Sequence, residues 1–215
     1  MKKVLSLLLV SATLISVSAQ AQDAKAKTIL DKVSSKFKSA KTMKADFTLT
    51  INGANGKSQG VKKGTFLMKG NKYKVDMSGQ QIICDAKSVW TYMPANKEVQ
   101  ISAYNPAEQT ISPAKLFSGA YEREYKYTYS GQKTIGGKKV DVIDLVPVNG
   151  SRSFTKVQLY VDPAASMVTG GNILEKNGGS YTYTIANVKS NAAIDDGTFT
   201  FNPATHPGVE VIDLR

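Results

Sequence analysis

Five strand-like segments follow one another between residues 64 and 103, and the short turns between them constrain the fold more than any other feature. The segments are residues 64–69, 72–77, 81–85, 89–93 and 98–103. Turn signals such as Gly70-Asn71 and Ser78-Gly79 leave no room for the helical crossover that parallel strands need. The sequence therefore predicts an antiparallel meander in this region.

Further strand-like segments lie on both sides of the meander. Before it, Ala45, Phe47, Leu49 and Ile51 alternate with polar residues, as in a half-buried strand. After it come residues 125–129, 132–135, 138–146, 154–161, 168–176, 180–188 and 198–201, with turns such as Gly136-Gly137 between them. A sheet of this size strains when it is flat and tends to curl. We expect a mainly β fold with some α-helix, built as a curved antiparallel half-barrel of roughly eleven strands.

Two helical segments accompany the strands. Asp23 can cap a helix that runs to about Ala40, because apolar residues recur there at three- and four-residue spacing. A second, short helix is indicated after Ser112-Pro113 and before Gly119. We expect the N-terminal helix and short lid helices to cover one opening of the half-barrel. Its interior is either packed solid or left hollow for a ligand, and the sequence leaves both alternatives open.

The N-terminus has the order of a secretory signal peptide. Lys2 and Lys3 precede an apolar stretch over residues 4–17, and the small-x-small site Ala19-Gln20-Ala21 follows. A membrane anchor is the alternative, but the stretch is shorter than the roughly 20 residues that span a bilayer. We therefore predict a signal over residues 1–21, one domain over residues 22–215, and export out of the cytoplasm.

The composition argues against several functions. The formal net charge is +11, but Arg occurs only at positions 123, 152 and 215, and the many lysines are dispersed, so no nucleic-acid partner is expected. His206 is the only histidine and Cys84 the only cysteine, which leaves no His-based triad or paired-His metal site and no internal disulfide. Nucleotide-binding glycine loops are also missing from the sequence. We predict no catalytic site, metal or cofactor, and a protein that is not an enzyme.

Several stretches, taken in order, resemble the periplasmic outer-membrane lipoprotein carrier family (LolA-type) over nearly the whole predicted mature chain. They are Ile29-Leu30-Asp31-Lys32-Val33, Lys44-Ala45-Asp46-Phe47-Thr48, residues 64–69 with Asn71-Lys72-Tyr73, residues 82–94, residues 196–201 and residues 207–212. The resemblance implies a helix-closed half-barrel in the periplasm of a Gram-negative-type cell. This half-barrel takes up lipoprotein acyl chains and carries them from the inner to the outer membrane. The implied partners are acylated lipoproteins, an inner-membrane lipoprotein-releasing ABC transporter and an outer-membrane acceptor, with the carrier as a monomer.

Eight residues are candidates for the acyl-chain cavity or its lid, with inward direction inferred from alternation. They are Phe47, Leu49, Phe66, Met68, Trp90, Tyr92, Leu116 and Phe117. The family's usual Arg-Pro pair, whose Arg ties the lid helices to the barrel, is replaced here by Lys69-Gly70, so Lys69 is the candidate for lid linkage. An alternative function is an envelope-stress sensor or regulatory binding module on the same half-barrel.

Overall fold

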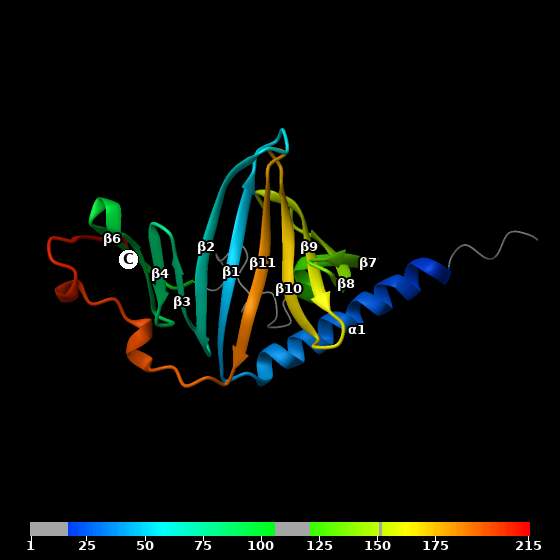
Figure 1. The fold of residues 1–215 in the computed structure, drawn as a ribbon, viewed down its shortest axis with the longest axis horizontal. Helices are drawn as coiled ribbons and strands as arrows, with labels where there is room; N and C mark the ends of the chain where they lie inside the picture. Colours follow the sequence, from blue (N-terminus) through cyan, green and yellow to red (C-terminus); the bar gives the residue numbers. More distant parts are fainter. Residues whose placement is uncertain (1–16, 106–120, 151) are drawn as a thin grey trace, which may run out of the picture.

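The computed structural model describes residues 17–105, 121–150 and 152–215 of the chain (Figure 1). The larger part of the predicted signal peptide, residues 1–16, and the candidates Leu116 and Phe117 lie outside the described residues. The helical elements are α1 (Val17–Ser39), η1 (Pro94–Asn96), α3 (Tyr121–Glu124), η3 (Asp196–Phe199) and η4 (Pro203–Thr205). The strands are β1 (Thr42–Asn52), β2 (Ser58–Lys69), β3 (Lys72–Met77), β4 (Gln80–Cys84), β5 (Ser88–Met93), β6 (Glu98–Ala103), β7 (Tyr125–Ile135), β8 (Lys138–Pro147), β9 (Phe154–Asp162), β10 (Met167–Glu175), β11 (Ser180–Ser190) and β12 (Glu210–Asp213).

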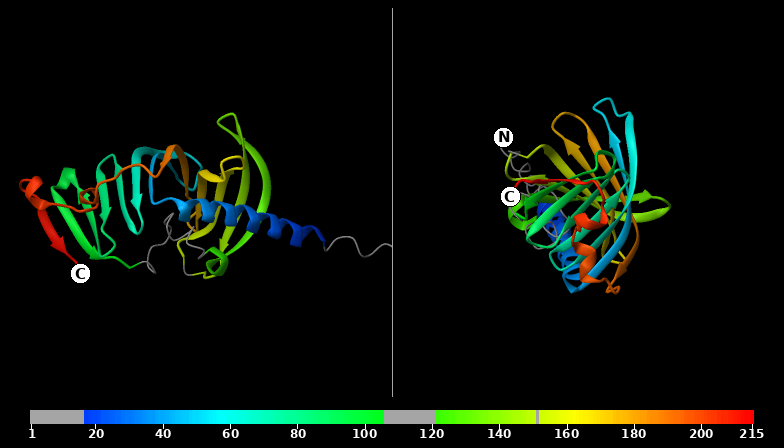
Figure 2. Two further views of the ribbon diagram at one scale, coloured as in Figure 1. Left: turned by 90° about the horizontal axis from the view of Figure 1, so that it is seen from below. Right: turned by 90° about the vertical axis from the view of Figure 1, so that its left-hand side faces the viewer.

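All the strands of the described chain form one open sheet in the order β12-β6-β5-β4-β3-β2-β1-β11-β10-β9-β8-β7. Neighbouring strands are antiparallel along β2 to β6 and from β1 through β11 to β7, so the predicted meander and mainly β class are confirmed. The sheet is curved, and α1 lies on its hollow side (Figure 2). The predicted half-barrel is therefore present as a curved sheet that stays open between its edge strands β12 and β7.

Apart from the bounds of single strands, three details of the strand prediction are wrong. Residues 125–129 and 132–135 belong to one strand, β7, with an irregularity between Tyr129 and Gln132 rather than a turn. The stretch around Thr198 is the 3-10 helix η3, because the Asp195 side chain accepts a hydrogen bond from the Gly197 N–H and caps a helical turn. The last strand, β12, was not predicted, and it pairs in parallel with β6.

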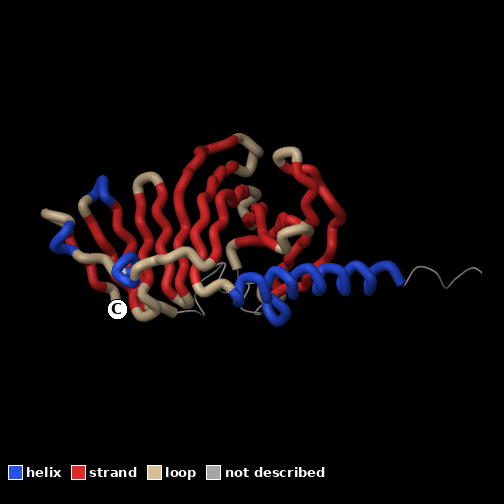
Figure 3. The backbone as a smooth tube through the Cα atoms, turned by 60° about the horizontal axis from the view of Figure 1, so that its bottom comes forward, coloured by secondary structure: helices blue, strands red, loops and turns tan. Residues whose placement is uncertain are grey.

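Helix α1 begins at Val17, so Asp23 lies inside it rather than at its N-terminus. The Ala and Gln residues around position 21 are good helix formers, which accounts for the longer helix. Ala26, Leu30 and Val33 are buried at the expected spacing. They pack against β7, β9 and β10 together with residues of β8, and this forms the largest core of the described chain. In Figure 3 the helix crosses the open side of this part of the sheet.

Cross-strand register divides the sheet into two faces. We call the face that carries α1 the inner face and the opposite one the outer face. Starting from Leu159 in the α1 core, the partners across the sheet are Gly171, Tyr183 and then Leu49. Side chains of directly paired residues share a face, and alternate residues along a strand share it too. Phe47 and Leu49 therefore lie on the inner face, as their alternation predicts.

Residues 191–215, which we call the C-terminal segment, cover the outer face at the other end of the sheet. Phe201 is buried against Ile83 and Val99, and half-buried Trp90, Tyr92 and Val209 pack around them. The segment then ends as β12, where the Glu210 N–H donates to the Lys97 carbonyl oxygen at 2.7 Å. Helix and C-terminal segment thus cover opposite faces at opposite ends of the sheet (Figure 2).

Candidate functional site

The inner face of β1 to β4 and β11 carries a continuous set of apolar side chains that are only half-buried. The register places them in adjoining rows across these strands. They are Phe47, Leu49, Ile51, Phe66, Val75, Met77, Ile82, Tyr183 and Ile185, and we call them the inner apolar surface. Apolar side chains at this density on one face of a sheet favour contact with another apolar group.

Gly64 shapes the middle of this surface. It pairs with Phe47 on one side and Met77 on the other. A Cβ atom at this position would lie 2.7 Å from the Phe47 Cζ atom and 2.2 Å from the Asp76 carbonyl oxygen. The missing side chain thus lets the Phe47 ring lie across β2, which extends the apolar surface over a strand that contributes no side chain there.

The end of α1 closes the lower edge of the inner apolar surface. Ala40, Met43 and Met68 are buried together, with Phe37 and Phe66 packed against them. The Ala40 N–H donates to the Phe37 carbonyl oxygen at 3.2 Å and ends the helix. Met68, which is 3% exposed, is therefore part of the packed floor, whereas Phe47, Leu49 and Phe66 stay partly accessible.

The structure brings four of the predicted cavity residues together and separates two others from them. Phe47, Leu49, Phe66 and Met68 share the inner face. Trp90 lies in a row of directly paired residues that continues through Ile83, Lys74, Leu67 and Lys44. Lys44 precedes the inner-face residue Ala45, so this row lies on the outer face. Tyr92, two residues further, shares the outer face with it.

The grouping of Trp90 and Tyr92 with Phe47 is therefore wrong. Strand β5 has apolar or aromatic residues at successive positions, so alternation within it does not tell which face is inward. Their aromatic rings are needed on the outer face, where the Tyr92 ring centroid lies 5.2 Å from that of Phe201 and 4.7 Å from that of His206. His206 is accordingly half-buried in this cluster.

Lys69 contacts the C-terminal segment. Its Nζ atom donates to the Ile194 carbonyl oxygen at 3.2 Å and lies 3.3 Å from Oδ1 of Asp196. Lys72 Nζ lies 3.1 Å from the same oxygen. Hydrogen bonds from Lys72 and Lys69 lower the pKa of Asp196. Among the described residues Lys69 thus ties β2 to the C-terminal segment and not to a lid helix, because its position on β2 directs it to the outer face.

A polar cluster joins α1 to α3, and no local sequence pattern indicated it. The Tyr121 hydroxyl donates to Oδ1 of Asp31 at 2.5 Å. Lys27 Nζ lies 3.2 Å from Asp31 Oδ2 and also contacts Glu122. The hydrogen bond from Tyr121 holds the pKa of Asp31 below its usual value, while burial and the Asp31 carboxylate raise the pKa of Tyr121. The cluster fixes the helix over the β7 end of the sheet.

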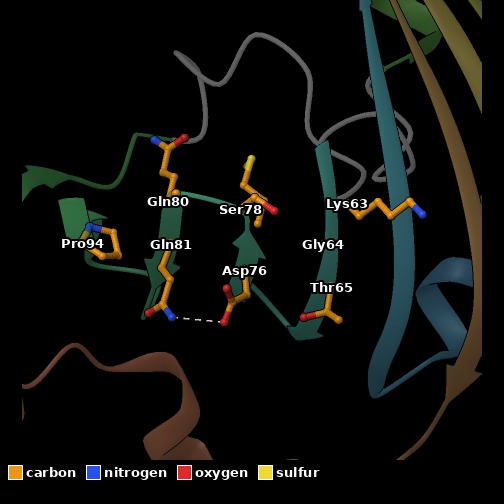
Figure 4. Close-up of a pocket in the computed structure, with 10 residues that line it drawn as sticks. Lys63, Gly64, Thr65, Asp76, Ser78, Gln80, Gln81 and Pro94 are labelled. Carbon is orange, nitrogen blue, oxygen red and sulfur yellow. Dashed lines mark hydrogen bonds between the residues drawn. The ribbon is translucent and has the colours of Figure 1, made fainter. Parts of the chain in front are cut away.

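A pocket of about 560 Å³ borders the inner apolar surface at Met77, where β3 and β4 end beside β2 (Figure 4). Its lining is mixed in character and includes Lys63, Thr65, Asp76, Met77 and Gln81. Asp76 accepts a hydrogen bond from the Gln81 amide at 3.1 Å. Across the described residues there is no group of three or more His, Cys, Asp or Glu placed to hold a metal ion. None of the described helices is long and apolar enough to span a bilayer.

Comparison with known proteins shows similarity to outer-membrane lipoprotein carriers. A family model described as "Outer membrane lipoprotein carrier protein LolA" matches residues 38–202. An outer-membrane lipoprotein carrier protein of Shewanella sp. (strain MR-7) is 26% identical over 221 residues, covering 100% of this chain and 98% of its own length.

Two further relatives differ in what they show. An uncharacterized protein of Methanocaldococcus jannaschii is 25% identical over 185 residues, which cover 85% of this chain, and the chain spans only about half (52%) of that relative. The crystal structure of an uncharacterized conserved protein from Thermus thermophilus has a TM-score of 0.60 at 13% identity, covering 88% of this chain and 99% of its own, and shows that the fold is shared.

The family model covers more than half of the sequence, including the strands that carry the inner apolar surface. The protein therefore belongs to the outer-membrane lipoprotein carrier family.

Proposed function

We propose that the protein is a soluble periplasmic carrier that shields the acyl chains of lipoproteins on its inner apolar surface and moves them from the inner to the outer membrane. The observation that carries this proposal is the set of half-buried apolar side chains on β1 to β4 and β11, in a chain of the lipoprotein carrier family. Phe47, Leu49 and Phe66 would contact the acyl chains, above the floor formed by Met68.

The physical chemistry of acyl chains supports a surface of this kind. Burying a chain is worth about 0.8 kcal/mol per CH₂ group, so a lipid anchor does not cross water unaided. A carrier must also release its cargo, and complete burial of a long chain would oppose release. A partly accessible apolar surface beside a helix offers shelter without full enclosure.

The role requires no chemical step, and we propose that the protein is not an enzyme. Its partners would be acylated lipoproteins, an inner-membrane ABC transporter that releases them, and an outer-membrane acceptor. Residues 22–215 would form the single working domain after removal of the signal, and the carrier would act as a monomer.

Two neighbouring residues of β1 provide the test. Leu49 lies on the inner face and Thr48 on the outer face, so Leu49→Glu places a charge on the inner apolar surface and Thr48→Glu places the same charge on the other side of the same strand. The measurement is binding of a fluorescent C16 fatty acid, followed by the ability to keep a purified triacylated lipoprotein soluble without detergent. We expect Leu49→Glu to weaken both at least tenfold and Thr48→Glu to change them less than twofold.

The proposal fails if the wild-type protein binds neither probe, or if the two variants lose binding equally while both remain folded by circular dichroism. Capture of a membrane regulator's periplasmic segment without any acyl binding would instead favour the regulatory-module alternative.

A further inference from the structure

Strand β2 extends well beyond its neighbour β3. Residues 64–69 of β2 pair with β3, and the last pair is Gly64 with Met77. The preceding residues 58–63, apart from Gln59 at a register shift, pair with β1 on one side, for example Val61 with Thr50 and Lys63 with Thr48. Within the described part of the chain no strand pairs with their other side. Figure 1 shows the β1–β2 hairpin rising past the ends of β3 and β4.

An exposed edge of this kind offers backbone N–H and C=O groups to another strand. Six residues span about 20 Å, which is the length of an ordinary strand. The pocket described above lies at the foot of this edge, next to Lys63 and Gly64 and over the β3–β4 turn at Ser78-Gly79 (Figure 4). An added strand would continue the line of β3, and its end would enter the pocket.

The side chains along the edge determine which residues are favoured in a strand that binds there. Lys57 and Lys63 are exposed and Lys62 is half-buried. No Asp or Glu occurs between Asp46 and Asp76 in the sequence, so this charge is not offset by neighbours along the chain. Val61, which is 57% exposed, provides one apolar contact between the lysines.

The same lysines disfavour a second copy of this chain as the occupant. Pairing two β2 edges would bring Lys62 and Lys63 of one copy close to the same residues of the other, and like charges on paired strands destabilise the pair. Lysines on an edge are a common protection against such self-association. An acidic strand is instead attracted to the edge, because its carboxylates and the lysines carry opposite charges.

We propose that residues 58–63 of β2 accept an extended acidic segment of another protein as an added strand, seated over the pocket at the β3–β4 turn. The main-chain hydrogen bonds provide affinity, and the lysines with Val61 select a segment in which acidic and β-branched residues alternate. The hydrogen-bonding edge of residues 58–63 borders the inner apolar surface through Lys62, the partner of Leu49. Addition of a strand to this edge goes beyond the proposed carriage of acyl chains and does not depend on it.

The test uses the mature chain and a fluorescent peptide of five Glu-Val repeats, with a peptide of five Lys-Val repeats as its opposite. We expect saturable binding of the Glu-Val peptide only. The double variant Lys62→Glu/Lys63→Glu should weaken it at least tenfold. The matched control is Lys138→Glu/Lys139→Glu, an exposed adjacent pair at the start of β8, which should change affinity less than twofold.

Hydrogen exchange locates the bound peptide independently of charge. Amides within residues 58–63 should become protected when the Glu-Val peptide is bound, and those of β12 should not. The proposal is overturned if the peptide does not bind, if the two double variants weaken binding equally, or if residues 58–63 gain no protection. A concentration-dependent dimer that protects these same amides without peptide would assign the edge to a second copy and also overturn it.

Discussion

At its two ends the sheet is covered on opposite faces, by different segments of the chain. At the β7–β10 end, α1 covers the inner face, and Leu30, Ile143 and Leu145 are fully buried. At the β3–β6 end, the C-terminal segment covers the outer face through Phe201. The inner face between these coverings keeps its apolar residues half-buried.

This difference separates stability from binding. A fully packed region loses several kcal/mol when one methylene-rich side chain is removed, because its surroundings cannot collapse into the space. A partly accessible surface loses less, because water or a ligand can occupy the space. We infer that the β7–β10 end holds the fold together, while the inner apolar surface is available for the proposed cargo.

The largest effect should come from a pair of identical substitutions in the two regions. Leu30→Ala removes a fully buried side chain from the α1 core, and we expect it to lower the free energy of unfolding by about 4 kcal/mol. Leu49→Ala, on the inner apolar surface, should cost about 1 kcal/mol. Urea unfolding followed by circular dichroism measures both. Equal losses would mean that the inner face is as tightly packed as the α1 core, which would remove the basis of the comparison.

Phe201→Ala tests the covering of the outer face. Phe201 is 5% exposed and its ring centroid lies 4.5 Å from that of His206. We expect a loss of about 3 kcal/mol, at the lower end for such truncations, because a segment at the sheet edge can adjust.

Trp90 reports on this change, since it is the only tryptophan and packs in the same cluster. Its emission should shift to the red in folded Phe201→Ala and stay unchanged in folded Leu30→Ala. An unshifted spectrum in the first variant would show that the C-terminal segment is not what shields Trp90.

Tyr121→Phe tests how firmly α1 is held over the sheet. The change removes the hydrogen bond to Asp31, whose side chain is 52% exposed, so we expect a loss of about 1 kcal/mol at neutral pH. The pKa of Asp31 is lowered in the folded state, so this contribution is present above about pH 4 and disappears as the pH falls through the lowered pKa. Unfolding of both proteins between pH 7 and pH 2 measures it. A difference that grows on acidification would contradict the assignment.

The smallest effect should come from Asp196→Asn on the outer face. The substitution removes the carboxylate that pairs with Lys69 and Lys72, and both partners are partly exposed. Because the pKa of Asp196 is lowered, the ion pairs hold above about pH 4 and are lost as the pH falls through the lowered pKa. Amides around Phe199 should exchange slightly faster at low salt and pH 7, and the difference should vanish at high salt. Unchanged exchange at low salt would show that the pairs do not hold the segment.

Local patterns were sufficient for much of the fold. The predicted bounds of β3 and β6 agree with the observed ones, and the buried spacing of Ala26, Leu30 and Val33 follows the predicted helical stripe. The prediction began β2 at Gly64, six residues late, because the Gly, Ser and Gln around position 59 are typical of a turn. Five of those six residues, all but Gln59, pair with β1 alone, and the six form the edge that we propose as a docking surface.

The candidate site was predicted only in part for a related reason. Alternation correctly put Phe47, Leu49 and Phe66 on a common face, because their strands alternate cleanly or pair directly. It failed for Trp90 and Tyr92, since the partner that buries them, Phe201, lies more than 100 residues away in the sequence. The link between Tyr121 and Asp31 has a similar separation and left no local signal.

By itself, the sequence determined the strand and helix types, the antiparallel meander and the family, because periodicity and turn residues act over a few positions. Only the tertiary structure decided which face each strand shows to which covering, and that β12 returns in parallel to β6. A period of two shows that a strand has two faces, but it does not show which face another segment covers. Which face is covered depends on contacts with segments that are distant in the sequence. The energy of those contacts cannot be deduced from the residues of one strand.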